Sequence, residues 1–304
     1  MKISIIIPIY NKESFIQKCI GSCLNQDFDD FEVIAVDDGS PDKCGEICEE
    51  MAAEDSRVKV LHITNSGHTA ARKYGVEHSS GEYITFVDAD DELLPGALTK
   101  MYDTITRENV DEVIGSYITN TGQTRIAPWQ GKVNSEVLLE DLLKGRNSFC
   151  VLWGILFRRD ILQGCLNIPR EVSGGEDILM QINVLLKQPR VFVLSEPVYL
   201  YSLGTSLVRP NYARSIITLH ETLQASLEKK APRYDTLFRI FKAKHYEDYI
   251  NYYEQNDSLD EHYAPLRTLS GSKGVPTKDR IILMLPRCLG KTVVKSYRKY
   301  IHRI

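Results

Sequence analysis

The sequence predicts an α/β fold with a mostly parallel sheet, followed by a helical C-terminal extension. Apolar segments of strand length alternate with helical patterns over the first third of the chain. The first segment, residues 3–9, is almost continuously apolar, as expected for a strand that is buried on both faces. In strand–helix–strand units the two strands are parallel and the crossover connection is right-handed. This alternation therefore predicts a parallel sheet.

Four strands and three helices are expected in this first third. The strands are predicted at residues 3–9, 31–36, 58–63 and 83–87. The first helix is expected to open at Asn11, with its apolar residues on one face, and a shorter helix follows Ser40. A third helix is predicted from about His68 to His78.

The remaining elements are spaced less regularly, and they suggest four regions. Helices are predicted at 95–108, 134–144 and 176–187, and strands near 110–118, at 151–157 and at 190–201. We expect a first domain over 1–210, two extension helices over 211–255, a linker rich in glycine and proline over 256–278, and a basic amphipathic tail over 279–304.

Composition places the chain among ordinary globular proteins. Its 304 residues are 43% hydrophobic and 26% charged, which suits one large domain or one domain with an appendage. The net charge of −4 gives no overall indication of nucleic-acid binding. No apolar run reaches the roughly 18 residues of a membrane span, and we interpret the first apolar run as a strand and not as a signal peptide.

The seven cysteines indicate reduced thiols in a cytoplasmic protein, because an odd number in so long a chain does not suggest a disulfide framework. Two pairs, Cys19 with Cys23 and Cys44 with Cys48, have helical i, i+4 spacing. Such pairs can hold zinc, or they can pack in the core as small apolar side chains.

The segment Asp88-Ala89-Asp90 at the end of the fourth strand is the sharpest local signal. In extended backbone, side chains two residues apart point to the same side. Two carboxylates placed in this way can bind Mg²⁺ or Mn²⁺ together with substrate phosphates. A solvated loop is the alternative interpretation.

A second acidic turn, Asp37-Asp38, follows the second strand. In open α/β sheets, ligands bind outside the carboxyl ends of the strands. These two carboxylates can therefore accept hydrogen bonds from a nucleobase or ribose, or they can cap the helix that follows.

Together these segments resemble the family 2 inverting glycosyltransferases, which have the GT-A fold. The matching segments are Ile3 to Asn11, Val36 to Ser40, Asn65 to Gly75, Phe86 to Asp91, Gly175 to Asp177, and Tyr199 to Tyr201 with Ser206. They occur in order over about residues 3–210, and the last of them resembles a motif of the branch that builds polysaccharides.

The resemblance implies roles in binding a nucleotide-diphosphate sugar, for which uridine diphosphate is the commonest carrier in the family. Pro8 and Tyr10 are expected to border the base. Asp38 is expected to recognise the base edge, with Asp37 beside it. Arg72 is expected to meet the diphosphate, although a solvated helix-face arginine is the alternative.

The resemblance also implies the chemistry. Asp90 is expected to bind the metal, with Asp88 near the ribose or supporting the metal. Asp177, next to Glu176, is expected to be the base that takes the proton of the acceptor hydroxyl. These two acids also suit the first turn of a helix. Lys73 stands where the family often has a small polar residue.

Three other functions fit the sequence less well. A dinucleotide-dependent dehydrogenase needs a glycine-rich turn after the first strand, where this chain has Pro8-Ile9-Tyr10-Asn11. A nucleotidyltransferase is expected to have a glycine-rich phosphate loop near the N-terminus, which is missing. A scaffold without activity is expected to have lost the metal or base carboxylates, and this chain keeps them.

The tail combines basic residues with interleaved apolar ones, and between Lys278 and Ile304 its only acid is Asp279. Such a segment can lie in a membrane interface and attract anionic lipid. We therefore expect peripheral attachment to the inner face of the cytoplasmic membrane. That location suits a lipid-linked glycan acceptor in surface polysaccharide synthesis. A solvated or protein-docking helix is the alternative.

For Trp153, the sequence leaves two interpretations open, a platform for a sugar ring and packing in the core.

Overall fold

The computed structural model describes residues 1–145, 151–204, 212–228, 232–252, 269–271, 275–285 and 292–293. The chain forms two compact units. The first comprises Met1–Leu139, Ser148–Arg170 and Met180–Val208, and the second comprises Glu140–Asn147, Glu171–Leu179 and Arg209–Ile304. Most of the predicted linker over 256–278 and of the tail over 279–304 lies outside the described residues, as does Ser206.

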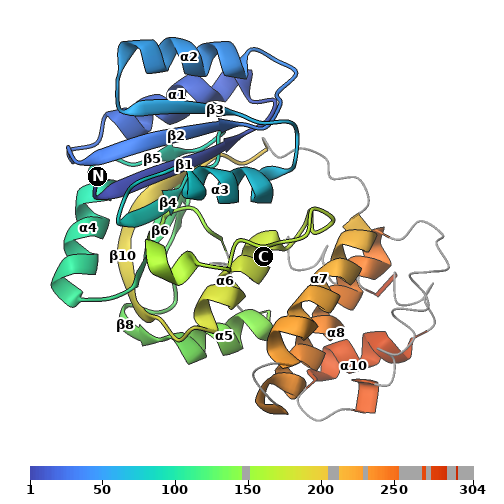
Figure 1. Cartoon of the computed structure of the whole chain (residues 1–304). Coiled ribbons are helices and arrows are strands. Elements are labelled where there is room, and N and C mark those ends of the chain that lie inside the picture. The colour runs from blue at the N-terminus through green and yellow to red at the C-terminus, as the bar shows by residue number, and fades with distance from the viewer. Residues whose placement is uncertain are drawn as a thin grey trace. The chain divides into compact units, whose positions relative to one another are not determined.

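A ten-stranded sheet forms the centre of the first unit (Figure 1). Its strands follow the order β3-β2-β1-β4-β9-β6-β10-β5, with β7 beside β6 and β8 beside β10. The bounds are β1 Ile3–Ile9, β2 Phe31–Asp37, β3 Val58–His62, β4 Tyr83–Phe86, β5 Glu92–Leu93, β6 Glu112–Thr119, β7 Thr124–Arg125, β8 Gly131–Asn134, β9 Ile155–Arg158 and β10 Arg190–Tyr201.

The predicted α/β fold class is confirmed. Strands β3, β2, β1 and β4 are all parallel, as the alternating pattern indicated. Antiparallel pairing begins at β9, which lies between β4 and β6 and is antiparallel to both. The predicted strand at 151–157 is shorter than expected, because β9 begins at Ile155 and Trp153 makes only an isolated bridge to Phe86.

The order of the four parallel strands creates a switch point between β1 and β4. The chain leaves β1 toward β2 and β3 on one side, and it returns to place β4 on the other side. Connections that diverge in this way leave a crevice outside the carboxyl ends of the two central strands, where ligands of open α/β sheets bind. The fold therefore places the ligand site at the ends of β1 and β4.

Helices cover both faces of this sheet. α1 (Glu13–Leu24) and α2 (Cys44–Glu54) lie on one face, and α3 (His68–Glu77) lies on the other (Figure 1). α1 begins two residues later than predicted, because Asn11 has a φ of 55°, which a right-handed helix does not allow. α4 (Ala97–Glu108) packs against β6 and β10.

Close packing of α3 on the sheet depends on Gly75. A Cβ atom at this position would lie 2.5 Å from the Ile6 side chain and 3.0 Å from that of Val36. A larger residue would push α3 away from β1 and β2. Glycine thus sets how closely the functional residues of α3 approach the ends of the strands.

The cysteines pack in the core. Cys19, Cys23, Cys44 and Cys48 are free and buried among the apolar side chains of α1, α2 and the sheet. Burial raises the pKa of Cys44 and Cys48 to about 12, so both remain protonated thiols at neutral pH. Zinc binds thiolates, so the packing interpretation is the one that these environments favour.

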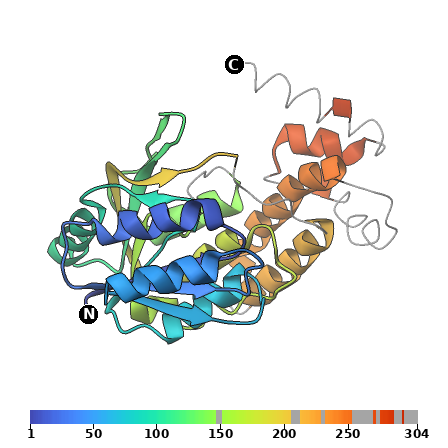
Figure 2. The same cartoon turned by 90° about the horizontal axis from the view of Figure 1, so that it is seen from above.

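The second unit is helical in its C-terminal region. α7 (Tyr212–Glu228) and α8 (Asp235–Tyr252) lie side by side (Figures 1 and 2). α10 (Thr277–Met284) packs on α8, and the Lys244 ammonium lies 3.2 Å from the buried Asp279 carboxylate. Within the described residues, no helix combines the length and apolarity that crossing a membrane requires.

Glu112, at the start of β6, is a fully buried carboxyl group in the first unit. It accepts a hydrogen bond from the Gln181 amide of α6 (Glu176–Leu185). The other oxygen of Glu112 and the amide oxygen of Gln181 have no hydrogen-bond partner. Burial raises the pKa of Glu112 to about 7, and a proton on this carboxyl group would supply the missing donor.

Replacing Glu112 by glutamine should therefore stabilise the protein at alkaline pH. The pKa of Glu112 is higher in the folded protein, at about 7, than the ordinary 4.5 of the unfolded chain. The contribution of Glu112 to stability is therefore full below pH 4.5 and is lost as the pH rises through 7. The free energy of unfolding of Glu112→Gln, minus that of the wild type, should be about 2–3 kcal/mol greater at pH 8 than at pH 5. Urea unfolding at both pH values measures this gain. The exposed Glu196→Gln should show none.

Candidate active site

The end of β1 presents the residues expected to border a base. Pro8 is buried in the strand, paired with Val36 of β2. Tyr10 follows the strand and is 39% exposed. The left-handed Asn11 then turns the chain into α1. An exposed aromatic ring at the switch point is available for stacking on a planar base.

Asp37 ends β2 and Asp38 follows it, and both are nearly buried, at 7% and 2% exposed. Asp37 accepts a hydrogen bond from the Ser40 amide at 3.0 Å, and its other carboxylate oxygen is hydrogen-bonded to His62 Nδ1 at 2.9 Å. The hydrogen bonds of His62 to Asp37 and Glu49 raise its pKa. The helix-cap alternative does not hold, because α2 begins only at Cys44.

Asp38 organises the loop that precedes α3. Its two carboxylate oxygens accept hydrogen bonds from the Ser66 amide at 2.6 Å and the Gly67 amide at 2.8 Å. Burial raises the pKa of Asp38, although these amide hydrogen bonds oppose the shift. The side chain therefore joins the end of β2 to the loop of the third motif. Recognition of the base by Asp37 and Asp38 remains a prediction.

Arg72 and Asp88 form an ion pair in which the arginine is nearly buried and the aspartate is partly exposed. Arg72 on α3 is 3% exposed, and its guanidinium lies 2.7 Å from the Asp88 carboxylate just beyond β4. The alternative of a solvated arginine is thus excluded. Pairing with Asp88 holds the guanidinium at the carboxyl end of the sheet, where the predicted contact with a diphosphate requires it.

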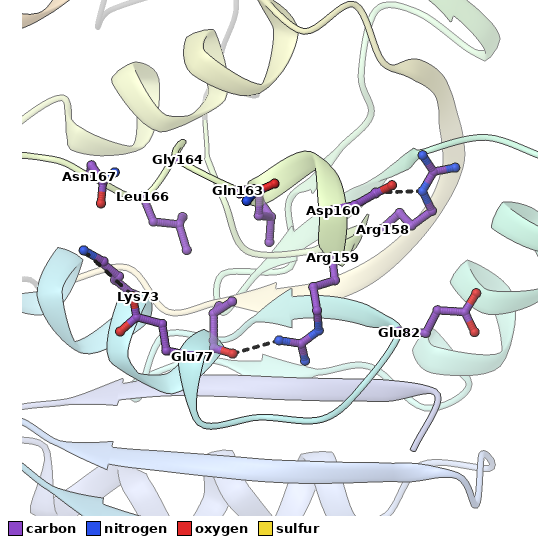
Figure 3. A pocket seen from close by; sticks show the side chains of 12 residues that line it. Lys73, Glu77, Glu82, Arg158, Arg159, Asp160, Gln163, Gly164, Leu166 and Asn167 are labelled. Carbon is purple, nitrogen blue, oxygen red and sulfur yellow. Dashed lines mark hydrogen bonds and ion pairs between the residues drawn. The ribbon is translucent and has the colours of Figure 1, made fainter.

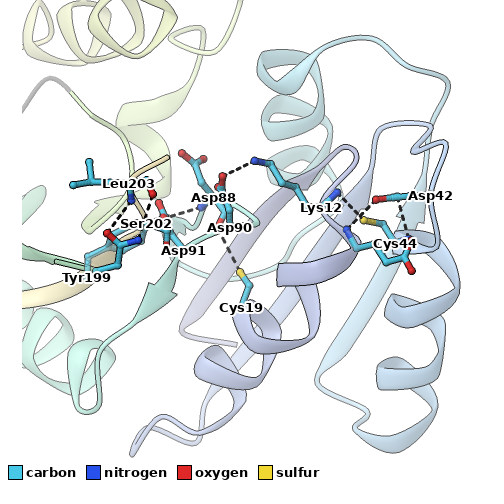
Figure 4. Close-up of polar contacts among 12 residues, drawn as sticks. Lys12, Cys19, Asp42, Cys44, Asp88, Asp90, Asp91, Tyr199, Ser202 and Leu203 are labelled. Atoms are coloured by element: carbon cyan, nitrogen blue, oxygen red, sulfur yellow. Dashed lines mark hydrogen bonds and ion pairs between the residues drawn. The ribbon is translucent and has the colours of Figure 1, made fainter. Parts of the chain in front are cut away.

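Asp90 lies in the same turn and is paired with a different cation. The Lys12 ammonium, from the start of α1, lies 2.5 Å from the Asp90 carboxylate (Figure 4). The two side chains are only 13% and 14% exposed. Sequence reasoning assigned no role to Lys12. The only signal for it is a basic residue that directly follows the Tyr10-Asn11 turn.

Asp91 has a structural role that sequence reasoning also missed. Its two carboxyl oxygens accept hydrogen bonds from the Tyr199 hydroxyl at 2.9 Å and from the Ser202 amide at 2.7 Å (Figure 4). Burial, together with repulsion from Asp88, raises the pKa of Asp91 to about 8. Asp91 thus anchors the end of β10 beside the Asp88–Asp90 turn and belongs to the support of the site.

The turn after β4 has the chemistry of a site for a hard cation. Asp88 and Asp90 present carboxylate oxygens, which Mg²⁺ and Mn²⁺ prefer. Within the described part of the chain, no group of three or more histidine, cysteine or acidic side chains forms a ready ligand set. A cation here would therefore take its other ligands from substrate phosphates and water, as Mg²⁺ commonly does.

Glu176 and Asp177 form the first turn of α6 and belong to the second unit. Glu176 is 3% exposed and Asp177 is half-buried. Gly175, with a φ of 82°, precedes them and packs against Leu219 of α7. The Ser215 hydroxyl of α7 accepts hydrogen bonds from the amides of Ser173 and Gly174, both at 2.9 Å. The loop that carries the predicted base is therefore held firmly within its own unit.

Trp153 is part of a packed aromatic cluster. Its ring stacks on Tyr199, with centroids 4.5 Å apart, and on Tyr201 at 5.1 Å, and it meets Tyr117 edge-on. Only 6% of the residue is exposed. With so little of the ring accessible, packing is the interpretation that the structure supports for Trp153.

A cavity of about 790 Å³ lies beside the outer face of α3 (Figure 3). Lys73 and Glu77 of α3 line it, together with Arg159, Leu162 and Leu166. None of the predicted site residues lines this cavity. Lys73 lines this cavity with its ammonium 3.9 Å from the Glu77 carboxylate, whereas its neighbour Arg72 is buried.

Comparisons with known proteins match the sequence to one family and the fold to a solved structure. The sequence model of Glycosyl transferase family 2 matches residues 4–166. The uncharacterized glycosyltransferase EpsJ of Bacillus subtilis is 32% identical over 207 residues, which are 66% of this chain and 60% of EpsJ. The chain therefore spans less than two thirds of that relative. Putative glycosyltransferase EpsH of the same organism is 32% identical over 241 residues, covering 75% of this chain and 69% of EpsH.

A solved structure has the same fold. The crystal structure of Staphylococcus aureus TarS 1-349 in complex with UDP-GlcNAc superposes with a TM-score of 0.70. The match covers 98% of this chain and 92% of the TarS chain, at 22% sequence identity. At this level of identity the likeness establishes the fold.

Proposed function

This chain belongs to glycosyl transferase family 2, and from that membership we propose that it transfers a sugar from a nucleoside-diphosphate donor to an acceptor hydroxyl, with inversion at the anomeric carbon. The observation that carries this proposal is the turn after β4. There, Asp88 and Asp90 lie at the switch point of the sheet, and each is paired with a cation from a different helix.

A metal ion on these carboxylates and the nearby Arg72 guanidinium would suit a diphosphate leaving group. Asp90 and Asp88 would hold Mg²⁺ or Mn²⁺, which would neutralise the charge that develops on the departing diphosphate. Arg72 adds a buried guanidinium on the rigid α3, which can bind phosphate oxygens through two donors. The exposed ring of Tyr10 would stack on the base, with Asp37 and Asp38 at its edge.

We assign to Asp177 the role of the base that accepts the proton of the acceptor hydroxyl. Inversion in a single displacement needs a carboxylate that accepts this proton as the new glycosidic bond forms. Asp177 is the half-buried member of the Glu176-Asp177 pair, whereas Glu176 is almost completely buried. The more accessible carboxylate is the better candidate for contact with a substrate.

We assign the donor to the UDP-sugars. Support comes from the TarS neighbour, whose structure holds UDP-GlcNAc, and from the predominance of UDP in the family. Release of nucleoside diphosphate from a panel of nucleotide sugars, with Mn²⁺, Mg²⁺ or EDTA, tests this choice. Turnover of one UDP-sugar that EDTA abolishes is the expected result. If no donor binds in the presence of metal, the enzymatic proposal is wrong.

We further assign the chain to the inner face of the cytoplasmic membrane, with a lipid-linked glycan as acceptor. On α10, Ile281 and Met284 are 48% and 65% exposed, and Lys278 lies on the same helical face. Exposed apolar side chains beside basic ones suit an anionic lipid surface. The basic residues that follow in the sequence extend this character.

Vesicle flotation tests the membrane assignment. The wild type should bind vesicles that contain phosphatidylglycerol and not vesicles of phosphatidylcholine alone. The double variant Ile281→Ser/Met284→Ser should bind roughly tenfold less, because two apolar side chains no longer enter the interface. Val137→Ser removes an equally exposed apolar side chain from α5 (Ser135–Leu143) and should bind like the wild type. Equal binding by all three proteins would exclude α10 as the contact.

A further inference from the structure

We propose that Lys12 is an exchangeable counter-ion of the metal site. In the free protein, its ammonium neutralises Asp90. When a divalent cation arrives with the donor, Lys12 releases Asp90 to that cation, and its ammonium then binds the donor diphosphate. This inference rests on the proposed function, because it takes Asp90 as a metal ligand.

The backbone of Lys12 is fixed at the switch point. Its amide donates a hydrogen bond to Cys44 Sγ at 3.2 Å, and the amide of Glu13 donates one to Asp42 at 2.9 Å (Figure 4). The Glu13 side chain in turn accepts a hydrogen bond from the Lys43 amide at 3.2 Å. The start of α1 is thus tied to the start of α2, which fixes the backbone from which the lysine side chain extends.

The Lys12 side chain crosses from the end of β1 to the end of β4. It reaches Asp90 at 2.5 Å, with both groups largely shielded from water. In such surroundings the attraction between opposite charges is stronger than at an open surface. A divalent cation bound to the same carboxylate would repel the ammonium at comparably short range. Lys12 and the metal therefore compete for Asp90.

Arg72 is not suited to this exchange. Its guanidinium is 3% exposed and pairs with Asp88 from a helix packed tightly on the sheet. Lys12 has a compact ammonium on a flexible four-carbon stem, which can rotate to a new partner at small cost. A diphosphate entering the crevice supplies that partner. Arg72 thus stays paired with Asp88, whereas Lys12 changes its partner from Asp90 to the diphosphate.

The exchange couples binding of the metal to binding of the nucleotide. A metal ion alone must displace Lys12 from Asp90 and brings no anion for the ammonium, so it binds weakly. A metal ion with a nucleoside diphosphate gives Lys12 a phosphate partner, so the pair binds strongly. By linkage, each ligand raises the affinity for the other by the same factor. An ion pair with a purely structural role would produce no such dependence on Lys12.

Mn²⁺ binding, followed by electron paramagnetic resonance with and without UDP, tests this coupling. In wild-type protein, UDP should raise the affinity for Mn²⁺ at least tenfold. In Lys12→Met, the affinity for Mn²⁺ alone should rise about tenfold, and the enhancement by UDP should shrink correspondingly. Lys18→Met removes a lysine of the same helix that pairs with Glu92 at 2.6 Å, and it should behave like the wild type.

The possible outcomes separate the inference from the function on which it rests. If Lys12→Met binds free Mn²⁺ no better than the wild type, the exchange is overturned while the metal site stands. If wild-type protein binds no Mn²⁺ even with UDP, the metal site itself fails. Lys12→Gln, which keeps a polar side chain without the charge, provides the same test if the methionine variant does not fold. Circular dichroism establishes folding for each variant.

Discussion

Replacing Asp177 by asparagine should lower the rate of sugar transfer about 10²-fold to 10⁴-fold, the usual contribution of a positioned general base. Asparagine has nearly the same shape as aspartate but cannot accept the proton of the acceptor hydroxyl. Binding of the donor should change little, because the predicted donor contacts come from β1, β2, α3 and the turn after β4. Transfer rates and the donor dissociation constant, measured on the same preparation, distinguish the two effects.

A matched control for this variant is Asp235→Asn. Asp235 also lies in the first turn of a helix of the second unit, α8, where it pairs with Arg239. The two variants remove the same favourable interaction between a carboxylate and the start of a helix. Full activity in Asp235→Asn with little in Asp177→Asn would support the catalytic role. Comparable small losses of transfer rate in both variants would show that Asp177 only stabilises the start of its helix.

Replacing Asp90 by asparagine should abolish the dependence of donor binding on metal and lower turnover about 10²-fold to 10³-fold or more. The neutral amide is a poor ligand for Mg²⁺ or Mn²⁺, and charge on the leaving diphosphate would no longer be neutralised. Calorimetric titration with a UDP-sugar, with Mn²⁺ or with EDTA, measures the loss directly. In the wild type the two titrations should differ strongly, and in the variant they should coincide.

The Asp90 variant also leaves the shielded Lys12 ammonium without its carboxylate partner. Its thermal unfolding in EDTA must therefore be compared with that of Asp103→Asn, which alters an exposed aspartate of α4. A folded Asp90 variant whose activity Mn²⁺ stimulates as much as in the wild type would rule out Asp90 as a metal ligand.

Much of the fold could be predicted because its elements have strong local signals. The apolar run of β1 and the helical periodicity of α1 appear within single windows of the sequence. Boundaries were less accurate where one backbone angle decided them, as at Asn11 before α1. The antiparallel pairing of β9 was not predicted either, because no local pattern states which neighbours a strand will have in the sheet.

The site shows the same division between local and long-range information. The sequence alone determined that acidic residues end β2 and β4 and that Tyr10 follows β1, since strand ends can be recognised from the pattern of apolar residues. Only the tertiary structure decided which cations those carboxylates face. Lys12 and Asp90 are separated by 78 positions, and Tyr199 and Asp91 by 108.

Such contacts depend on strand order, on the register of the sheet and on how closely each helix packs. These are properties of the whole chain, and Gly75 illustrates them, because a missing Cβ on α3 lets that helix lie against Ile6 and Val36. The sequence thus determined which chemical groups are available to this protein. The packing of distant segments decided which of those groups meet, because contact energies are gained only once the chain has folded.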